Sequence, residues 1–149
     1  MHLLYGKFLQ ESEEMALFTW GPKYSVGVDT IDKQHQGLVE ALNELHAAMI
    51  KGQANAVTGP LLQKLVKYTR EHFATEERMM SSTRYPGLAQ HRIKHQDLTR
   101  QVEEFAGRFE RGEISVNVHL MNFLRDWLST HILKEDREYG PWLNQHGLS

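Results

Sequence analysis

Apolar residues recur at alternating steps of three and four along four stretches of the chain, the pattern of helices that each bury one face. These stretches run from about residue 29 to 50, 58 to 81, 87 to 111, and 115 to just before Gly140-Pro141. Glycine and proline separate them, as in the segment from Lys51 to Pro60 and at Tyr85-Pro86-Gly87. Because the connections are short, neighbouring helices are expected to be antiparallel. The pattern predicts an all-α, up-down-up-down antiparallel four-helix bundle with an irregular N-terminal arm.

Composition narrows the class of protein. The 149 residues suffice for one domain with its own core. Seventeen Lys and Arg against nineteen Asp and Glu give a net charge of −2, which argues against a nucleic-acid-binding surface. The chain has no cysteine, so disulfides, thiolate metal sites and iron–sulfur clusters are excluded.

The N-terminus gives no export signal. The first ten residues, MHLLYGKFLQ, hold too short an apolar run for a signal-peptide core. No stretch approaches the 18 or so apolar residues that a membrane span needs. The sequence therefore predicts a cytoplasmic protein without a membrane span.

Polar residues interrupt the buried face of every predicted helix. These residues are His35, His72, Glu76, His91, His95 and His131. Asp136 follows His131 by five residues, about 140° around an α-helix, so it reaches inward only from the flank or where the last turn is distorted. Burying one unpaired polar group costs about 1–3 kcal/mol. Five such histidines and two acids therefore need a common partner.

The position of each residue along its helix indicates a metal site. In an up-down-up-down bundle the starts of the first and third helices are level with the ends of the second and fourth. His35 and His91 lie early in their helices, whereas His72 and His131 lie late in theirs. All seven side chains should thus converge at one end of the bundle.

The ligand set limits the choice of metal. Five imidazoles and two carboxylates exceed what one tetrahedral zinc uses. Mixed nitrogen and oxygen ligands suit iron, manganese or zinc. Two octahedral ions that shared both carboxylates and one solvent-derived oxygen would leave one vacant position, which a small diatomic molecule could occupy.

Short motifs around these residues resemble the hemerythrin family, and within it the single-domain bacterial hemerythrins. The matching strings are Asp32-Lys-Gln-His35, HFATEE from His72, and FLRDWLSTHILKED, which ends at Asp136. The resemblance covers roughly residues 18 to 143. It suggests an N-terminal extension over residues 1–17 and a hemerythrin-like domain over residues 18–149.

The resemblance implies two non-haem iron ions bridged by Glu76, Asp136 and an oxo or hydroxo group. One iron would also be bound by His91, His95 and His131, and the other by His35 and His72. It further implies reversible dioxygen binding, for oxygen carriage, storage or delivery, rather than an enzyme. An unidentified oxygen-accepting or signalling protein is the expected partner.

Reversible oxygen binding needs a dry pocket. The expected wall residues lie one turn from ligands and are Trp127, Leu98, Leu38 and Met79. Glu77 is expected to point away from the site, into solvent. The histidines outside the cluster are expected to be ordinary: His2, His46, His119 and His146. Trp20 and Trp142 are expected to plug the ends of the bundle.

Three other functions remain open from the residues alone. A di-iron enzyme could reduce peroxide or nitric oxide, or oxidise ferrous iron, but the seven ligands leave no obvious acid–base residue. The two Glu-x-x-His motifs of ferritin-like oxidases are also missing. An oxygen or redox sensor would require a separate output partner, and a purely structural metal site would bind no exogenous ligand.

Overall fold

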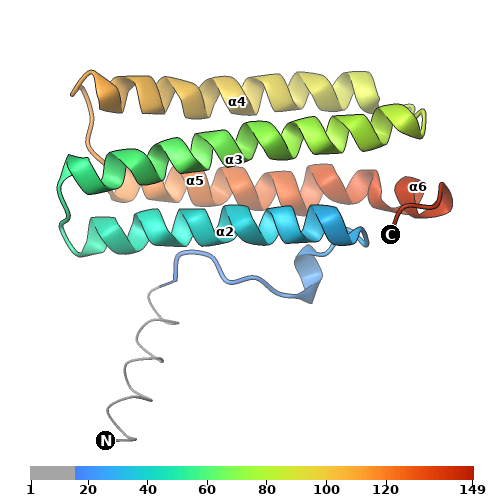
Figure 1. Ribbon diagram of the computed structural model, residues 1–149, viewed down its shortest axis with the longest axis horizontal. Coiled ribbons are helices and arrows are strands. Elements are labelled where there is room, and N and C mark those ends of the chain that lie inside the picture. The colour runs from blue at the N-terminus through green and yellow to red at the C-terminus, as the bar shows by residue number, and fades with distance from the viewer. Residues whose placement is uncertain (1–15) are drawn as a thin grey trace, which may run out of the picture.

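A computed structural model of the chain describes residues 16–149, except for the side chains of Leu133 and Lys134. Four long helices form an antiparallel bundle (Figure 1). They are α2 (Asp29–Ile50), α3 (Asn55–Ser82), α4 (Leu88–Glu110) and α5 (Val118–Thr130). Residues 16–149 contain no strand. The predicted all-α four-helix bundle is confirmed, whereas most of the predicted N-terminal extension lies outside the described residues.

Two helix starts differ from the prediction. α3 begins at Asn55, three residues before the predicted Thr58. Its first turn forms because the amides of Val57 and Thr58 both donate to the Ala54 carbonyl oxygen, at 2.9 and 3.1 Å. α5 begins at Val118 instead of near residue 115, because the Asn117 side chain caps it by accepting from the Leu120 amide at 3.0 Å.

The fourth predicted helix does not run unbroken to Gly140. A π-helical turn, η2 (His131–Glu135), follows α5 directly, and a 3₁₀ turn, η3 (Asp136–Glu138), comes next. The chain then ends in a short helix, α6 (Gly140–Gln145). A side chain at Gly140 would place its Cβ 2.3 Å from the Val26 carbonyl oxygen, so glycine is required where α6 crosses the N-terminal arm.

The N-terminal arm closes one side of the bundle before α2 begins. It contains a 3₁₀ turn, η1 (Pro22–Tyr24). Asp32, in the first turn of α2, holds the arm by accepting from the Ser25 hydroxyl at 2.6 Å and the Val26 amide at 2.9 Å. Farther along α2, Asn43 accepts from the Phe18 amide and donates to its carbonyl oxygen. The arm is thereby fixed to α2 at both of its ends.

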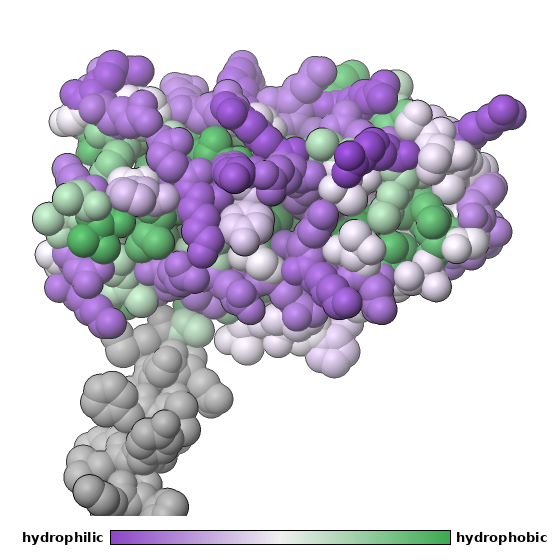
Figure 2. All heavy atoms as spheres, in the orientation of Figure 1, coloured by the Kyte–Doolittle hydropathy of each residue, from purple (hydrophilic) through white to green (hydrophobic). Residues whose placement is uncertain are grey.

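The apolar core consists of two clusters. The larger one fills most of the bundle and includes Leu42, Leu65 and Leu124. The smaller one lies where the arm and α6 meet the bundle, and includes Ile31, Met80 and Leu143. Along α2 and α3, the predicted ligands lie between residues of the smaller cluster and residues of the larger one. The outer surface in Figure 2 is mostly hydrophilic, with hydrophobic side chains in smaller patches.

Candidate metal centre

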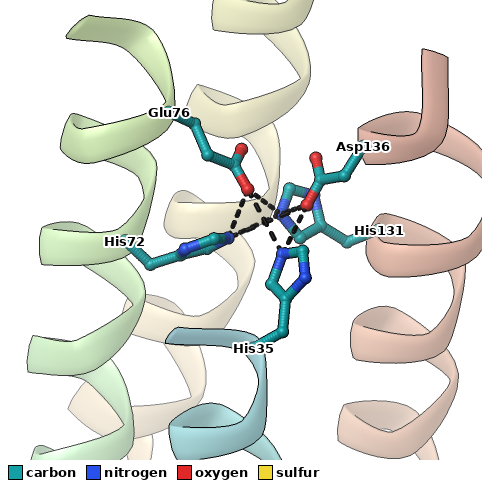
Figure 3. Close-up of side chains that lie close together, drawn as sticks. All are labelled: His35, His72, Glu76, His131 and Asp136. Carbon is teal, nitrogen blue, oxygen red and sulfur yellow. Dashed lines mark hydrogen bonds and ion pairs between the residues drawn. The ribbon is translucent and has the colours of Figure 1, made fainter. Parts of the chain in front are cut away.

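All seven predicted ligands lie together inside the bundle. No more than 2 % of any of them is exposed to solvent. They fall into two overlapping groups whose ligand atoms lie within 4.8 Å of one another. Figure 3 shows one group, formed by His35, His72, Glu76, His131 and Asp136. The second group is formed by Glu76, His91, His95 and Asp136. Both carboxylates belong to both groups, which suits a centre of two ions with shared bridging acids.

Asp136 is surrounded by three imidazoles that present the same nitrogen to it. Its Oδ2 atom lies 2.7 Å from Nε2 of His35 and 2.7 Å from Nε2 of His131. Its Oδ1 atom lies 3.1 Å from Nε2 of His91. The two oxygens thus face different histidines, as a bridging carboxylate requires.

Glu76 gathers the other two imidazoles in the same way. Its Oε1 atom contacts Nε2 of His72 and lies 3.3 Å from Nε2 of His35. Its Oε2 atom lies 2.9 Å from Nε2 of His95. The hydrogen-bond geometry of that last contact is poor, so both atoms are buried without a hydrogen-bond partner among residues 16–149. A cation between them would satisfy both.

The π-helical turn brings Asp136 into the site. The Asp136 amide donates to the His131 carbonyl oxygen, five residues back. Such a wider turn takes more residues to come round than an α-helical turn does. Asp136 and His131 therefore project to the same side, although a regular helix would separate them by about 140°. Of the two routes that the sequence left open for Asp136, from the flank or through a distorted last turn, the structure has the distorted turn.

The expectation that Glu77 points away from the site is wrong, although its carboxylate does line a groove that is open to solvent. Its carboxylate turns toward the cluster, and its Oε2 atom lies 3.3 Å from Nδ1 of His95. The other oxygen accepts from Nε of Arg92 at 3.0 Å. Glu77 is only 26 % exposed. The Cα–Cβ bond of Glu77 points away from the core, but the side chain is long enough to reach around the helix. The direction of that bond therefore did not predict the position of the carboxylate.

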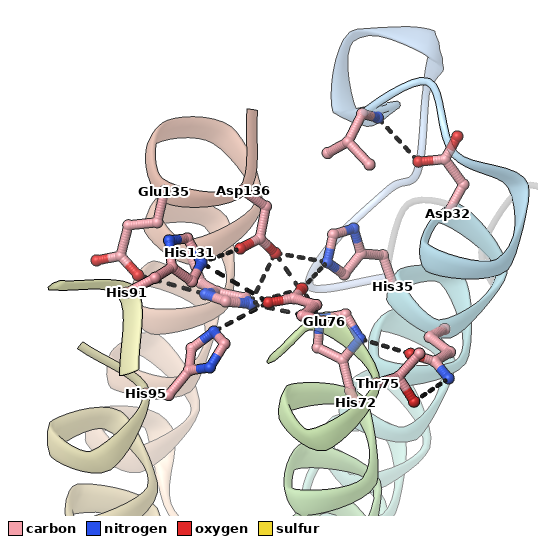
Figure 4. A network of polar contacts seen from close by, with 12 residues as sticks. Asp32, His35, His72, Thr75, Glu76, His91, His95, His131, Glu135 and Asp136 are labelled. Atoms are coloured by element: carbon pink, nitrogen blue, oxygen red, sulfur yellow. Dashed lines mark hydrogen bonds and ion pairs between the residues drawn. The ribbon is translucent and has the colours of Figure 1, made fainter. Parts of the chain in front are cut away.

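In two more histidines, Nδ1, the outer ring nitrogen that faces away from the cluster, has an acceptor that the sequence reasoning did not identify (Figure 4). Nδ1 of His72 lies 2.9 Å from Oε1 of Gln34, and Nδ1 of His131 lies 3.3 Å from Oε2 of Glu135. Metal-binding histidines commonly donate their second N–H in this way. The four-residue spacing from His131 to Glu135 was an available signal. Nδ1 of His35 is buried without a hydrogen-bond partner among residues 16–149.

Two aromatic residues against the ligands were also missed. The Phe73 ring stacks on the His95 ring, with centroids 4.0 Å apart and planes 5° from parallel. Tyr139 is fully buried, its ring centroid lies 5.3 Å from that of His91, and its hydroxyl has no hydrogen-bond partner among residues 16–149. Burial and the charges of Asp136 and Glu76 raise the pKa of Tyr139 well above its ordinary value.

The charges of the metal-free cluster support one another. Burial opposes charge on His91, but hydrogen bonds to Asp136 and Glu76 outweigh it and raise the His91 pKa to about 9. The same two acids raise the pKa of His35, mainly through hydrogen bonds, and that of His131, mainly through their charges. Burial also opposes charge on the two carboxylates, yet neighbouring histidines lower the pKa of both. The acids thus favour their ionised forms and these three imidazoles their protonated forms, so metal binding must displace protons from the rings.

His131 lies closer to the His72 side than the resemblance implies. Its Nε2 atom is 3.4 Å from Nε2 of His72, and it belongs to the group of His35 and His72. Its ring also lies 5.4 Å from that of His95. His131 thus lies between the group of His35 and His72 and the group of His91 and His95, which are the two halves of the cluster, and its assignment to the iron of His91 and His95 stays a prediction.

The four predicted wall residues divide between the two apolar clusters. Leu38 and Trp127 are buried in the larger cluster, and Leu98 packs against it while partly exposed. Met79 packs against the smaller cluster. Nε1 of Trp127 is buried without a hydrogen-bond partner among residues 16–149. The ligands therefore have apolar side chains on both sides, and the role of these four as a pocket wall stays a prediction.

The remaining histidines stay apart from the cluster or outside the described residues. His119 is exposed and His46 half-buried, Nδ1 of His146 lies 2.7 Å from the Trp142 carbonyl oxygen, and His2 falls in the part that the structure does not describe. Trp142 donates to the Thr83 carbonyl oxygen at 3.1 Å. The Trp20 ring lies 6.3 Å from that of His35, so this residue covers the site more directly than the prediction of an end plug implied.

Comparisons with known proteins agree with this geometry. Residues 26–143 match the family model described as hemerythrin HHE cation binding domain. The chain is 37% identical to a bacteriohemerythrin of Stenotrophomonas maltophilia over 132 residues, which cover 89% of this chain and 85% of that protein. It is 29% identical to a myohemerythrin of Riftia pachyptila, covering 82% of this chain and 90% of the relative. A crystal structure titled as wild-type hemerythrin superimposes with a TM-score of 0.82 at 34% identity, covering 86% of this chain and 98% of that one.

Proposed function

This chain belongs to the hemerythrin family, and on that premise we propose that it binds dioxygen reversibly at a di-iron centre, for oxygen carriage, storage or delivery. The ligands are His35, His72, Glu76, His91, His95, His131 and Asp136. Glu76 and Asp136 would hold both irons together, with an oxo or hydroxo group as the third bridge. The observation that carries the proposal is the inward orientation of five imidazole Nε2 atoms around two fully buried carboxylates.

The donor set fits iron on chemical grounds. Imidazole nitrogens and carboxylate oxygens bind iron well, and the absence of thiolates makes the site unsuited to softer metals. Three of the five imidazoles have an acceptor beside Nδ1, namely Gln34, Glu77 and Glu135. Such acceptors favour the tautomer that carries its proton on Nδ1 and leaves Nε2 free for a metal.

The two irons, when bound, supply the electrons that dioxygen takes up on binding and returns on release. The protein holds the ligands in place and keeps water out. Reversal requires that water and stray protons stay away, because both promote loss of the oxygen-binding state. We propose that Trp127, Leu98, Leu38 and Met79 form the wall that excludes them. The burial of Leu38 and Trp127 beside the ligand layer supports this role.

Family membership favours oxygen binding over catalysis. We also propose that the domain begins at Phe18, which is buried in the larger apolar cluster and is bound through its backbone to Asn43. No helix among residues 16–149 is long and apolar enough to cross a membrane. We further propose that the protein is cytoplasmic and that another protein accepts its oxygen or responds to it. Cell fractionation tests the location.

The visible spectrum and the iron content of the purified protein test the proposed function. The protein is reduced without oxygen, exposed to air and then placed under vacuum. Two irons per chain and an adduct that forms in air and disappears under vacuum are expected. Two irons that oxidise at once without a persistent adduct would favour an enzyme or a redox sensor instead, and a chain that binds no iron would favour a structural role.

Replacement of single histidines tests the ligand set. His72→Ala should lose iron, because it removes a ligand and leaves Glu76 without its nearest imidazole. His119→Ala is the matched control, since this exposed histidine lies outside the cluster. Normal iron content and oxygen binding in His72→Ala would contradict the assignment.

A further inference from the structure

The two halves of the cluster differ in the charge of the groups beside their outer nitrogens. Nδ1 of His72 faces the neutral amide of Gln34 at 2.9 Å. Nδ1 of His95 faces the carboxylate of Glu77 at 3.3 Å. A group that accepts from a metal-bound histidine tunes the metal through that ring. Nδ1 of His131 faces a second carboxylate, that of Glu135, at 3.3 Å. With His131 on the iron of His91 and His95, as the family resemblance implies, that iron has two such carboxylates beside its histidines and the other iron has none among residues 16–149, so the two metal positions differ electronically.

The surrounding hydrogen bonds fix the orientation of Gln34. The Thr75 hydroxyl donates to the Glu71 carbonyl oxygen at 3.0 Å, so its oxygen is left to accept. It accepts from Nε2 of Gln34 at 3.1 Å and from Nη2 of Arg78 at 3.2 Å. The amide oxygen of Gln34 therefore faces His72. The hydrogen bonds that lead outward from this ring through Gln34 and Thr75 end at the guanidinium group of Arg78.

The carboxylate of Glu77 is paired with a cation. Nε of Arg92 donates to it at 3.0 Å. It also lines a groove of about 360 Å³ between α3 and α4, where water reaches it. The same groove is lined by Phe73, whose ring covers His95. Glu77 thus brings a hydrated, paired carboxylate to the outer edge of a ring that is itself buried.

The imidazoles of His72 and His95 belong to different halves of the cluster. His72 is grouped with His35 and His131, and His95 with His91, while both groups share Glu76 and Asp136. On the basis of the proposed di-iron function, we propose that Glu77, acting through His95, makes the iron bound by His91 and His95 the more easily oxidised of the two. A fixed negative charge nearby stabilises the larger positive charge of a ferric ion. Glu77 is thus a positioning residue that directs the first oxidation to one half of the centre.

Glu77→Gln tests this inference, because it keeps the shape and an acceptor for Nδ1 but removes the charge. The measurement is the distribution of ferric iron between the two positions in the one-electron-oxidised protein, by Mössbauer spectroscopy, together with the first reduction potential. The variant should have a higher potential, and its preference for the His95 half should fall by about tenfold, the order of magnitude by which loss of such a partner changes metal affinity or activity. Gln34→Glu should shift the preference toward the His72 half.

Glu103→Gln is the matched control. Glu103 lines the same groove and pairs with Arg70 at 2.7 Å, but it is absent from the contacts of the cluster. This variant loses the same charge and should leave the ferric distribution unchanged. An unchanged distribution in Glu77→Gln, or an equal change in Glu103→Gln, would overturn the inference.

A second readout does not depend on oxygen binding. In zinc-loaded protein, the NMR resonance of the His95 Nδ1 proton should move upfield in Glu77→Gln and stay in place in Glu103→Gln. An unmoved resonance in Glu77→Gln also overturns the inference.

The two proposals fail separately. Lack of a reversible oxygen adduct in the unaltered protein contradicts the proposed function, whereas a normal adduct with unchanged iron asymmetry in Glu77→Gln contradicts only the role of Glu77.

Discussion

The Asp136 amide donates to the carbonyl oxygen of His131, while the Asp136 carboxylate lies 2.7 Å from Nε2 of the same residue. One widened helical turn thus joins the two residues through both backbone and side chain. The carboxylate also lies 2.7 Å from Nε2 of His35, which comes from the neighbouring helix α2. The π-helical turn is therefore what allows a residue five positions after His131 to share its site.

Asp136→Asn should abolish normal iron loading, because the amide keeps the shape but cannot serve as a charged bridge. His35, His91 and His131 would also lose the charge that raises their pKa values. We expect fewer than two irons per chain, measured by metal analysis. Circular dichroism should show that the helices remain. Two tightly bound irons in this variant would show that Asp136 is not a bridge.

Gly140→Ala should destabilise the protein by about 1–3 kcal/mol, because its Cβ would lie 2.3 Å from the Val26 carbonyl oxygen and push the arm away from α6. Thermal unfolding measures the change. Gly37→Ala in α2 is the control, since its Cβ would meet nothing within 4 Å. Alanine is also favoured over glycine inside helices by about 0.5–1 kcal/mol. Equal melting temperatures for the two variants would contradict the close approach at Gly140.

Metal uptake by the metal-free protein should strengthen as pH rises. The His91 pKa is raised to about 9, and the pKa values of His35 and His131 are raised as well. His91 therefore carries a proton near neutral pH, the same shift favours the protonated forms of His35 and His131, and a metal must displace these protons. Competition titrations with cobalt(II) between pH 6 and 9 should give a rising affinity with proton release. An affinity that is constant over this range would contradict the assigned protonation.

Trp127→Ala should shorten the lifetime of the oxygen adduct. Trp127 is buried at 5 % exposure, and its loss would open space beside the ligand layer for water. Its ring centroid lies 6.3 Å from that of Phe73, which in turn stacks on His95. The decay of the visible spectrum in air measures the lifetime. Phe123→Ala, at a partly buried position of the same helix, controls for loss of an aromatic side chain. Equal lifetimes in the two variants would remove Trp127 from the proposed wall.

The spacing of apolar residues determined the four helices and their antiparallel order. Polar residues at buried positions then identified six candidate ligands, because burial without a partner is too costly for so many groups at one level of a bundle. Asp136 could be identified from the sequence as a candidate ligand, but the sequence did not show whether its side chain reaches the site. A regular helix directs it to the flank, and only the π-helical turn brings it inward.

The tertiary structure alone decided where the long side chains around the ligands lie. Glu77 and Gln34 both neighbour a ligand in sequence, yet each turns to the outer nitrogen of a histidine on another helix. Helical periodicity fixes the direction of a Cα–Cβ bond, whereas the end of a long side chain follows the partners that packing provides. The sequence by itself therefore determined which residues enter the centre, and the packing of α2, α3 and α4 decided how charge is distributed around it.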